Sequence, residues 1–466
     1  MISEILLYSG GIILTYFPLY AFVKLLSHKK DEENIVVIGL ISYIVFFVIV
    51  TILANPNLPD SAYFRVMDMT IKGNDLSIYR IGSIGFILVY FVVSYVFNST
   101  KGSKKFNIVS YLDKDTMRLF YSVIGTIIVA VIFSIAWPHV IEFIFKFLSF
   151  VASDVNNPMS MFAYGGFERL MTLFNLENII HQEIWFGTLG GSWVNLAGKT
   201  FSGDVNIWAA QLTESMNVIG TSDAGRFTSA YYVLNIFAMP AYLIGIYSVY
   251  TNKDFRNRNI MVLVLTLIVS IISGILLPLE LMMLVTSPLI YLFHLFMSSF
   301  VYAILSGLSI YLGFSYNGFL LSANPGNIID LITLSRKPVL FDKIVILLLV
   351  GIFTFLIYFV MTRLYYSKLA LDLLNIGSKE DKINDFIERL GGIENIEKIS
   401  NTPTRIHASL IDRDKLNVAG LHRQGVTKIV ETRAGFILSI GSSSYIYQNE
   451  VNKRIKNNQV QDDVND

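Results

Sequence analysis

The chain has 466 residues, of which 53% are hydrophobic and only 15% are charged, with 34 Phe and 25 Tyr. This composition predicts an integral membrane protein with many spans and excludes an ordinary soluble domain. A formal net charge of +1, without a long run of Lys and Arg, argues against nucleic acid as a partner. The absence of Cys excludes disulfides, thiolate metal sites and a cysteine nucleophile.

The first apolar stretch covers residues 5–26 and follows Glu4. Because no Lys or Arg precedes it and no small-residue cleavage site follows, we expect a retained span and not a signal peptide. Strong candidates for further spans are residues 35–54, 81–97, 118–136, 228–250, 260–276 and 343–361. Weaker candidates, interrupted by Gly, Pro or polar residues, are 139–152, 161–186, 279–297 and 299–321. The pattern predicts about ten α-helical membrane segments, some of them broken or re-entrant.

Basic residues mark the loops that belong in the cytoplasm. Lys and Arg occur in the short polar loops at 27–34, 99–105 and 251–259, and after the last span as Arg363 and Lys368. The positive-inside bias therefore places the C-terminal part of the chain in the cytoplasm. The first of these loops is also acidic, which leaves the side of the N-terminus open.

The segment from Gly187 to Thr228 is too polar to lie against lipid and too long for a tight connection. Its Trp193 and Trp208, with Trp185 just before it, are typical of anchors at a membrane interface. Two interpretations remain equally open: an extracytoplasmic or interfacial loop, and a re-entrant segment that faces a solute.

From Lys379 the sequence has the pattern of a soluble domain. Residues 379–390 have apolar positions at helical spacing after Ser378, a good N-cap, and Gly391 ends the helix. Two alternating strands, a short helix, a hairpin and a last helix are expected at 396–400, 404–411, 412–425, 426–441 and from Ser442. We therefore predict a membrane domain at 1–366, a linker at 367–378, a small α+β domain at 379–450 and a disordered tail at 451–466.

Several motifs follow one another in a recognisable order. "LGGIENIEKI", "TPTRIHASLID", "KLNVAGLHRQG" and "VTKIVETRAGFILSIG" resemble the enzyme IIB domain of the glucose superfamily of the bacterial phosphotransferase system. "FAYGGFERLMTLFNLENIIHQEIWF", "DAGRFTSAYYVLNIFAMPAYLIGIY" and "SGILLPLELMMLVTSPLIYLFHLF" are similar to the matching enzyme IIC permease. The resemblance implies a homodimeric, multi-pass sugar permease in the bacterial cytoplasmic membrane, in contact with lipid, with its IIB-like domain in the cytoplasm.

The chain departs from the family in the IIB loop. The family's phosphorylated cysteine precedes a Thr-Arg pair by two residues, and here Thr402 takes its place before Thr404 and Arg405. An alcohol needs an adjacent base to become a nucleophile, and Pro403 removes a backbone N–H donor. We therefore expect no catalytic residue here and lost phosphotransfer, although the resemblance is to a sugar phosphotransferase. The lost cysteine also argues against contact with the soluble phosphotransfer proteins.

The resemblance also suggests substrate-binding residues. The positions of the family's histidine pair hold Glu177 and Asn178, and Glu280 is the surviving member of a motif with two glutamates around a proline. A carboxylate in so apolar a segment contacts a solute or forms a structural ion pair, and Arg226 is the partner to consider. Arg226 follows Gly225, which suits a break in a helix, so we include both as candidate solute contacts.

Single, scattered histidines and the absence of Cys predict neither a metal site nor a cofactor. Three functions remain open: a permease that borrows a IIB domain, a sugar carrier without phosphotransfer, and a non-transporting sugar sensor. The primary expectation is a transporter of the glucose, N-acetylglucosamine and maltose superfamily that has lost its own phosphotransfer, with the sensor as the alternative.

Overall fold

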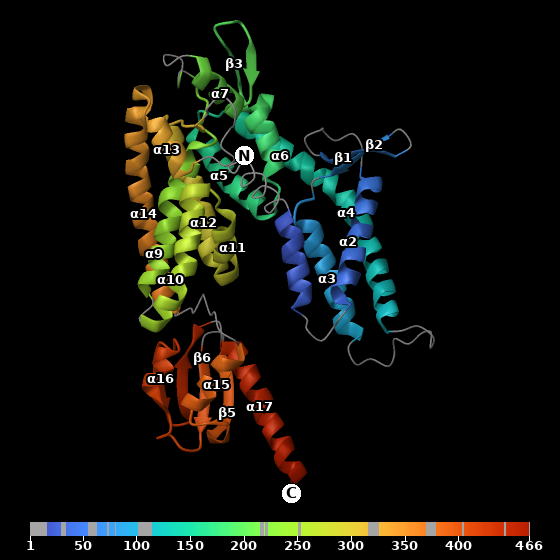
Figure 1. Ribbon diagram of the computed structural model, residues 1–466, viewed down its shortest axis with the longest axis vertical. Coiled ribbons are helices and arrows are strands. Elements are labelled where there is room, and N and C mark those ends of the chain that lie inside the picture. The colour runs from blue at the N-terminus through green and yellow to red at the C-terminus, as the bar shows by residue number, and fades with distance from the viewer. Residues whose placement is uncertain are drawn as a thin grey trace. The chain divides into compact units, whose positions relative to one another are not determined.

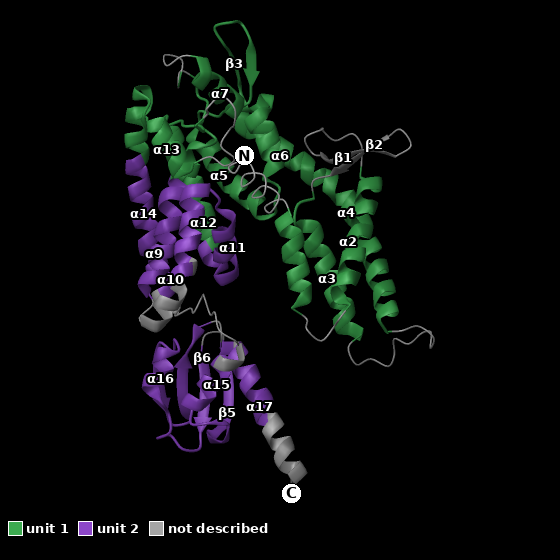
Figure 2. Cartoon of the chain, viewed as in Figure 1, with its two compact units in different colours: residues 1–232, 291–347 green, residues 233–290, 348–466 purple. Residues whose placement is uncertain are grey.

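The computed structural model describes residues 16–28, 34–54, 63–71, 74–79, 81–100, 114–214, 219, 222–249, 253–315, 326–369, 379–402, 405–441 and 444–465. Three predicted features lie outside these residues: the start of the first span, Ser378 and Thr404. Most of the predicted linker also lies outside them. The chain forms two compact units (Figure 2). Unit 1 contains residues 1–232 and 291–347, and unit 2 contains residues 233–290 and 348–466.

Unit 1 begins with apolar helices that pack through small residues. These helices are residues 16–27, α2 (Ile35–Leu53), α3 (Ile84–Thr100) and α4 (Lys114–Ser153) (Figure 1). Ser42 on α2 and Ser122 and Thr126 on α4 are buried at such contacts. Small side chains let apolar helices approach closely, because association in lipid depends on packing and not on the hydrophobic effect. Between α2 and α3 lies an antiparallel hairpin, β1 (Tyr63–Ile71) and β2 (Asn74–Tyr79), which the sequence does not predict.

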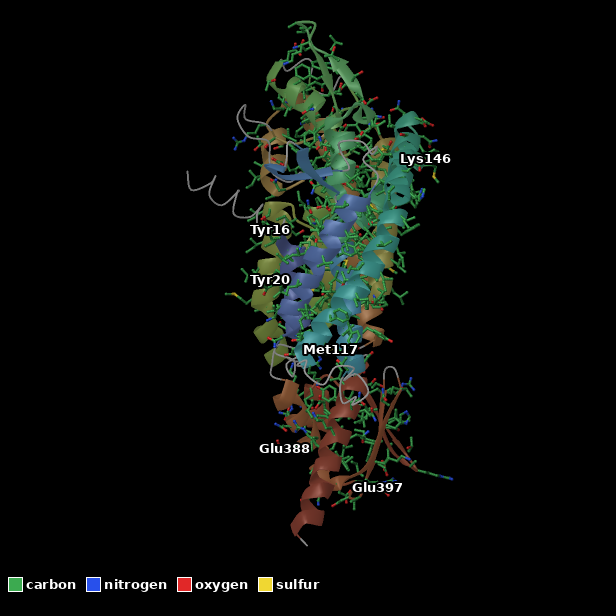
Figure 3. The ribbon with its side chains drawn as sticks, turned by 90° about the vertical axis from the view of Figure 1, so that its right-hand side faces the viewer. Tyr16, Tyr20, Met117, Lys146, Glu388 and Glu397 are labelled. Atoms are coloured by element: carbon green, nitrogen blue, oxygen red, sulfur yellow. The ribbon has the colours of Figure 1, made fainter. Side chains whose placement is uncertain are left out.

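Helix α4 corrects the prediction of two separate segments at 118–136 and 139–152. It runs unbroken for 40 residues through Pro138. Figure 3 shows Met117 and Lys146 near its two ends. A proline removes one backbone hydrogen bond, and the apolar turns on both sides keep theirs. At ~1.5 Å per residue the helix is about 60 Å long, which is about twice the thickness of a hydrocarbon layer.

The remaining elements of unit 1 lie within the polar segment 187–228 or before and after it in the chain. They are α5 (Pro158–Leu173), α6 (Glu177–His181), the π-helical turn η3 (Gln182–Phe186), the 3-10 turns η4 (Thr188–Gly190) and η7 (Pro338–Leu340), β3 (Ser192–Val194), β4 (Thr200–Ser202), α7 (Asp204–Glu214), most of α8 (Ser229–Val233) and α12 (Pro288–Gly307), α13 (Ile328–Ser335) and the start of α14 (Phe341–Leu369). The described part of the polar segment therefore contains η4, the β3–β4 hairpin and α7, and its place relative to a membrane stays a prediction. Trp208 on α7 is 1% exposed and donates its indole N–H to the Phe314 carbonyl at 2.7 Å, so it is a core residue and not an interface anchor.

The helices of unit 2 also pack through small residues. They are the π-helical turns η5 (Leu234–Ala238) and η6 (Val269–Ser273), α9 (Met239–Val249), α10 (Lys253–Ile268), α11 (Leu277–Thr286) and most of α14. Gly245 lies against Thr362, and Gly351 lies against the ring of Phe237, closely enough that a Cβ would clash. The predicted boundary between the membrane segments 279–297 and 299–321 is wrong. In the structure α11 ends at Thr286 and Pro288 starts α12.

Five helices in the described part of the chain are long and apolar enough to cross a membrane. They are Ile35–Leu53, Lys114–Ser153, Ser229–Val249, Pro288–Gly307 and Pro338–Tyr366, and the shorter apolar helices are Ile84–Thr100, Leu263–Ser273 and Leu277–Thr286. Large apolar side chains point outward from several of them, such as Ile52, Ile132 and Leu349. An apolar outer surface is typical of contact with lipid.

The C-terminal region is a small sheet with helices. It comprises α15 (Lys379–Arg389), the 3-10 turn η8 (Ile393–Asn395), β5 (Ile396–Thr402), β6 (Arg405–Leu410), α16 (Val418–Arg423), β7 (Lys428–Thr432), β8 (Gly435–Ser439) and α17 (Ser444–Asn465). The strands are antiparallel in the order β5-β6-β8-β7, so the predicted helix, strands and hairpin are confirmed.

Helix α17 (Ser444–Asn465) covers most of residues 451–466, where the sequence predicts a disordered tail. Tyr447 and Val451 of this helix are buried in the core of the C-terminal region. Once packing has formed the first turns, each further residue adds a hydrogen bond at little cost, so polar residues extend the helix.

Candidate functional site

A fully buried carboxylate lies among the helices of unit 1. Glu168 and Arg169 are adjacent on α5 and are 0% and 2% exposed. The hydroxyl of Tyr302 donates to Oε2 of Glu168 at 2.7 Å, and Nη2 of Arg169 lies 3.3 Å from the same oxygen. The other oxygen, Oε1, accepts from the hydroxyl of Tyr231 and lies 3.2 Å from Nε2 of His181. Four partners from α5, α6, α8 and α12 thus offset the cost of burying the charge.

Aromatic rings hold this network in place. The ring of His181 stacks on Trp185 with centroids 3.5 Å apart, and the guanidinium of Arg169 lies over the ring of Tyr231 at 4.6 Å. Arg169 also donates to the Tyr231 hydroxyl at 2.6 Å. Neither Glu168 nor Arg169 is among the site residues predicted from the sequence. An adjacent acid and base in the apolar segment "FERL" was the signal that could have found them.

A pocket of about 370 Å³ lies beside this network, at the C-terminal end of α4. Its wall includes Ser149 and Ser153 of α4, Thr188 of η4, the backbone of Gly190 and Gly191, and Arg226. Hydroxyl groups and a guanidinium on one small cavity are suited to a solute with several polar oxygens.

Arg226 is held in the pocket wall by residues of unit 1. Its Nη2 lies 2.7 Å from Oδ2 of Asp223, its Nη1 donates to Oδ1 of Asn156 at 3.2 Å, and its guanidinium lies 5.2 Å from the centroid of the Tyr311 ring. Gly225 before it has φ +92°, and a Cβ there would lie 2.6 Å from the backbone nitrogen of Gly313. Only glycine fits this turn without strain.

A second buried acid lies behind the same turn. Asp204 begins α7, is 1% exposed, and accepts the Gly225 N–H on Oδ1 at 2.9 Å. Burial raises the pKa of Asp204 to about 7, although Arg226 and the backbone N–H groups of residues 225–227 lower it. This carboxyl therefore changes charge near neutral pH.

Tyr302 connects the Glu168 network to the pocket. Its hydroxyl lies 2.7 Å from Glu168 and 3.1 Å from the carbonyl of Phe227, which lines the pocket. The single hydroxyl proton can serve one of these acceptors at a time. The ring of Tyr164 packs edge-on against both Phe227 and Tyr302. One hydrogen bond therefore links the network to a residue that lines the pocket.

The structure brings some predicted residues together and separates others. Arg226 lines the pocket and Gly225 precedes it in the turn, whereas Glu177 is half-buried at the start of α6 and Asn178 is exposed there. Neither Glu177 nor Asn178 lines the pocket. Glu280 is 0% exposed in the first turn of α11 and belongs to unit 2, so its pairing with Arg226 stays a prediction.

The end of β5 at Thr402 is at the surface. Thr402 ends β5 and is exposed, and its hydroxyl donates to the Arg405 carbonyl with a long separation of 3.4 Å. Its own carbonyl accepts from the hydroxyl of Ser444 at 2.7 Å. Arg405 is also exposed. In the described part of the loop no carboxylate or imidazole hydrogen-bonds the Thr402 hydroxyl, so no base is in place to activate it.

Among the residues that the structure describes, no group of three or more His, Asp or Glu side chains could hold a metal ion. A search of the sequence against models of protein families finds no model that matches. The likeness to the phosphotransferase system accordingly rests on the ordered motifs of the sequence.

Proposed function

We propose that this protein is a sugar carrier of the phosphotransferase-permease type that has lost its own phosphotransfer. Its membrane part has about ten segments, some of them re-entrant, and forms a homodimer through its first spans. It lies in a bacterial cytoplasmic membrane, and the IIB-like region lies in the cytoplasm. The carrier has neither a metal nor a cofactor.

The observation that supports a carrier most directly is the pocket in unit 1. Its volume of about 370 Å³ and its three hydroxyl side chains beside Arg226 suit a neutral, polyhydroxylated solute. Sugar hydroxyls would donate to Ser and Thr oxygens and accept from the guanidinium. The buried Glu168 network supports the pocket from outside its lining, since the Tyr302 hydroxyl lies 3.1 Å from the carbonyl of the lining residue Phe227.

The loss of phosphotransfer rests on Thr402. An exposed hydroxyl with a long hydrogen bond to a carbonyl lacks the adjacent base that an alcohol nucleophile needs. A phosphate ester is also a far poorer phosphoryl donor than a phosphorylated thiol. Sugar therefore leaves the carrier unmodified.

Uptake of labelled glucose, N-acetylglucosamine and maltose by proteoliposomes tests this proposal. We expect uptake of unmodified sugar that phosphoenolpyruvate and the soluble phosphotransfer proteins do not change, and no phosphate on residues 379–466 by mass spectrometry. Stoichiometric phosphate on Thr402 that moves onto a sugar would contradict the loss of phosphotransfer. Arg226→Gln should weaken binding about tenfold, which corresponds to one lost charge-assisted hydrogen bond.

The sensor remains a second candidate because the C-terminal region keeps a complete core of its own. A domain without chemistry that still folds is suited to binding a partner. Sugar binding to the purified protein without any uptake or exchange would favour the sensor. Uptake or exchange of a bound sugar would favour the carrier.

A further inference from the structure

Asp204 is a buried acid that the proposed carrier does not yet use. It lies directly behind the pocket wall, because a Cβ on the pocket residue Gly190 would lie 2.6 Å from the Asp204 backbone nitrogen. Oδ1 accepts the Gly225 N–H, and Oδ2 has no hydrogen-bond partner of good geometry among the described residues. A buried carboxylate with an open oxygen is costly as an anion and is far more easily accommodated with a proton.

The groups around this carboxyl come from each element packed against it. The turn before α8 contributes Arg226, whose charge attracts it, and backbone N–H groups, while α5 contributes the phenol of Tyr164. From η3, the backbone at Trp185 and Phe186 packs against Gly203, the neighbour of Asp204. Asp223 pairs with the same guanidinium at 2.7 Å. Arg226 therefore already has one carboxylate partner, and ionised Asp204 adds a second negative charge behind the pocket.

We propose that Asp204 binds a proton together with the solute, which makes the carrier a proton-coupled symporter. A sugar oxygen in the pocket accepts hydrogen bonds from the N–H groups of Arg226, and ionised Asp204 competes for the same positive charge. When a proton adds to Oδ2, this competition ends and the guanidinium is available to the sugar. Because linkage is reciprocal, a bound sugar favours the protonated carboxyl by the same factor. This inference rests on the proposed carrier function.

The raised pKa of Asp204 fits this role. With a pKa of about 7, Asp204 gains and loses its proton within the physiological range. The proton gradient would then supply the driving force that phosphorylation no longer supplies.

A test that needs no ligand follows the melting temperature of the purified protein against pH. The folded-state pKa of about 7 is above the ordinary Asp value of 3.8, so the unfolded chain loses this proton first as the pH rises. The contribution of Asp204 to stability is therefore full below about pH 4, falls up to about pH 7, and stays low above it. Asp204→Asn should remove this pH-dependent contribution to stability, and the variant should melt at a higher temperature than the natural protein at about pH 8. Glu214→Gln, which removes another acid of α7, should keep the pH dependence of the melting temperature that Asp204 causes.

The coupling itself is tested by binding and uptake of labelled glucose, N-acetylglucosamine and maltose. If only the protonated form binds, affinity should be about tenfold higher at about pH 5.5 than at about pH 8. Asp204→Asn should bind equally at both values and exchange sugar without concentrating it against an inward proton gradient. Glu214→Gln should keep the pH ratio and concentrate sugar.

The two proposals fail in different ways. Binding without a pH ratio in the natural protein, or a ratio retained by Asp204→Asn, would overturn symport while leaving the carrier in place. If no sugar binds at either pH, both the proposed carrier function and the proposed proton symport are refuted. In that case, the melting profiles still decide whether Asp204 is a proton site, and parallel profiles for the natural protein and Asp204→Asn would overturn that as well.

Discussion

Individual side chains in unit 1 show how a membrane protein keeps a charge inside its helices. Glu168 is fully buried, and two tyrosine hydroxyls, one guanidinium and one imidazole lie around its two oxygens. Each partner alone replaces little of the lost hydration, but together they occupy most of the acceptor positions of the carboxylate. The arrangement orders four helical elements around a single residue.

Glu168→Gln should lower stability by about 3–5 kcal/mol, because the buried charge of Arg169 then loses the carboxylate 3.3 Å away. Thermal unfolding in detergent measures this effect. Tyr302→Phe is the matched control, since it removes one hydrogen bond to Glu168, worth about 1.5–3 kcal/mol, and keeps the charge pair. Equal losses in the two variants would show that the charge pair contributes nothing beyond a hydrogen bond.

At the scale of elements, the connection from η3 through η4 to α7 places the pocket. In the π-helical turn η3, Trp185 stacks on His181, and after η4 the β3–β4 hairpin returns the chain so that α7 starts beside Gly190. A Cβ on Gly190 would lie well inside van der Waals contact of the Ile184 carbonyl and 2.6 Å from the Asp204 nitrogen. The close approach of these two backbone segments therefore depends on glycine.

Gly190→Ala should destabilise the protein by about 1–3 kcal/mol or more and abolish solute binding, since η4 and α7 must move apart. The matched control is Gly307→Ala at the end of α12, where the nearest atom to a Cβ is Cγ of Pro158 at 3.5 Å. This control should stay within about 1 kcal/mol of the natural protein. Melting temperatures of the two variants test this prediction. Equal values would refute the close approach of the Gly190 backbone to Ile184 and Asp204.

At the scale of the whole molecule, the C-terminal region has a hydrophobic core built only from residues 383–451. Helix α15 contributes one side of this core, the buried faces of β5, β6 and β8 contribute another, and α17 completes it. A core that needs no residue of the membrane helices predicts a region that folds independently.

Residues 379–466 expressed alone should therefore unfold in one cooperative transition in urea and give dispersed amide resonances. Within this fragment, Leu390→Ala removes a fully buried side chain and should cost about 2–5 kcal/mol. Val418→Ala, at an exposed position, should cost less than about 1 kcal/mol. A fragment without a cooperative transition would show that this region needs the rest of the chain.

Composition and periodicity alone determined the class of the protein and the elements of its C-terminal region. Apolar runs of span length indicate membrane helices, and the alternation in residues 396–411 and the turn at Gly435 indicate strands and a hairpin. That residue 402 is Thr, in a chain without Cys, is likewise a property of the sequence. These features are local, because each depends on residues within one or two turns of chain.

Tertiary structure decided where the helices end and which polar residues meet. Helices that are apolar on all sides have no period that marks their limits, so the unbroken α4 and the boundary at Thr286 could not be predicted. Glu168 and Tyr302 are 134 residues apart in sequence, and Asp204 meets Gly225 through a turn that no local pattern specifies. The site depends on how helices pack, and packing is set by contacts between distant side chains that periodicity does not record.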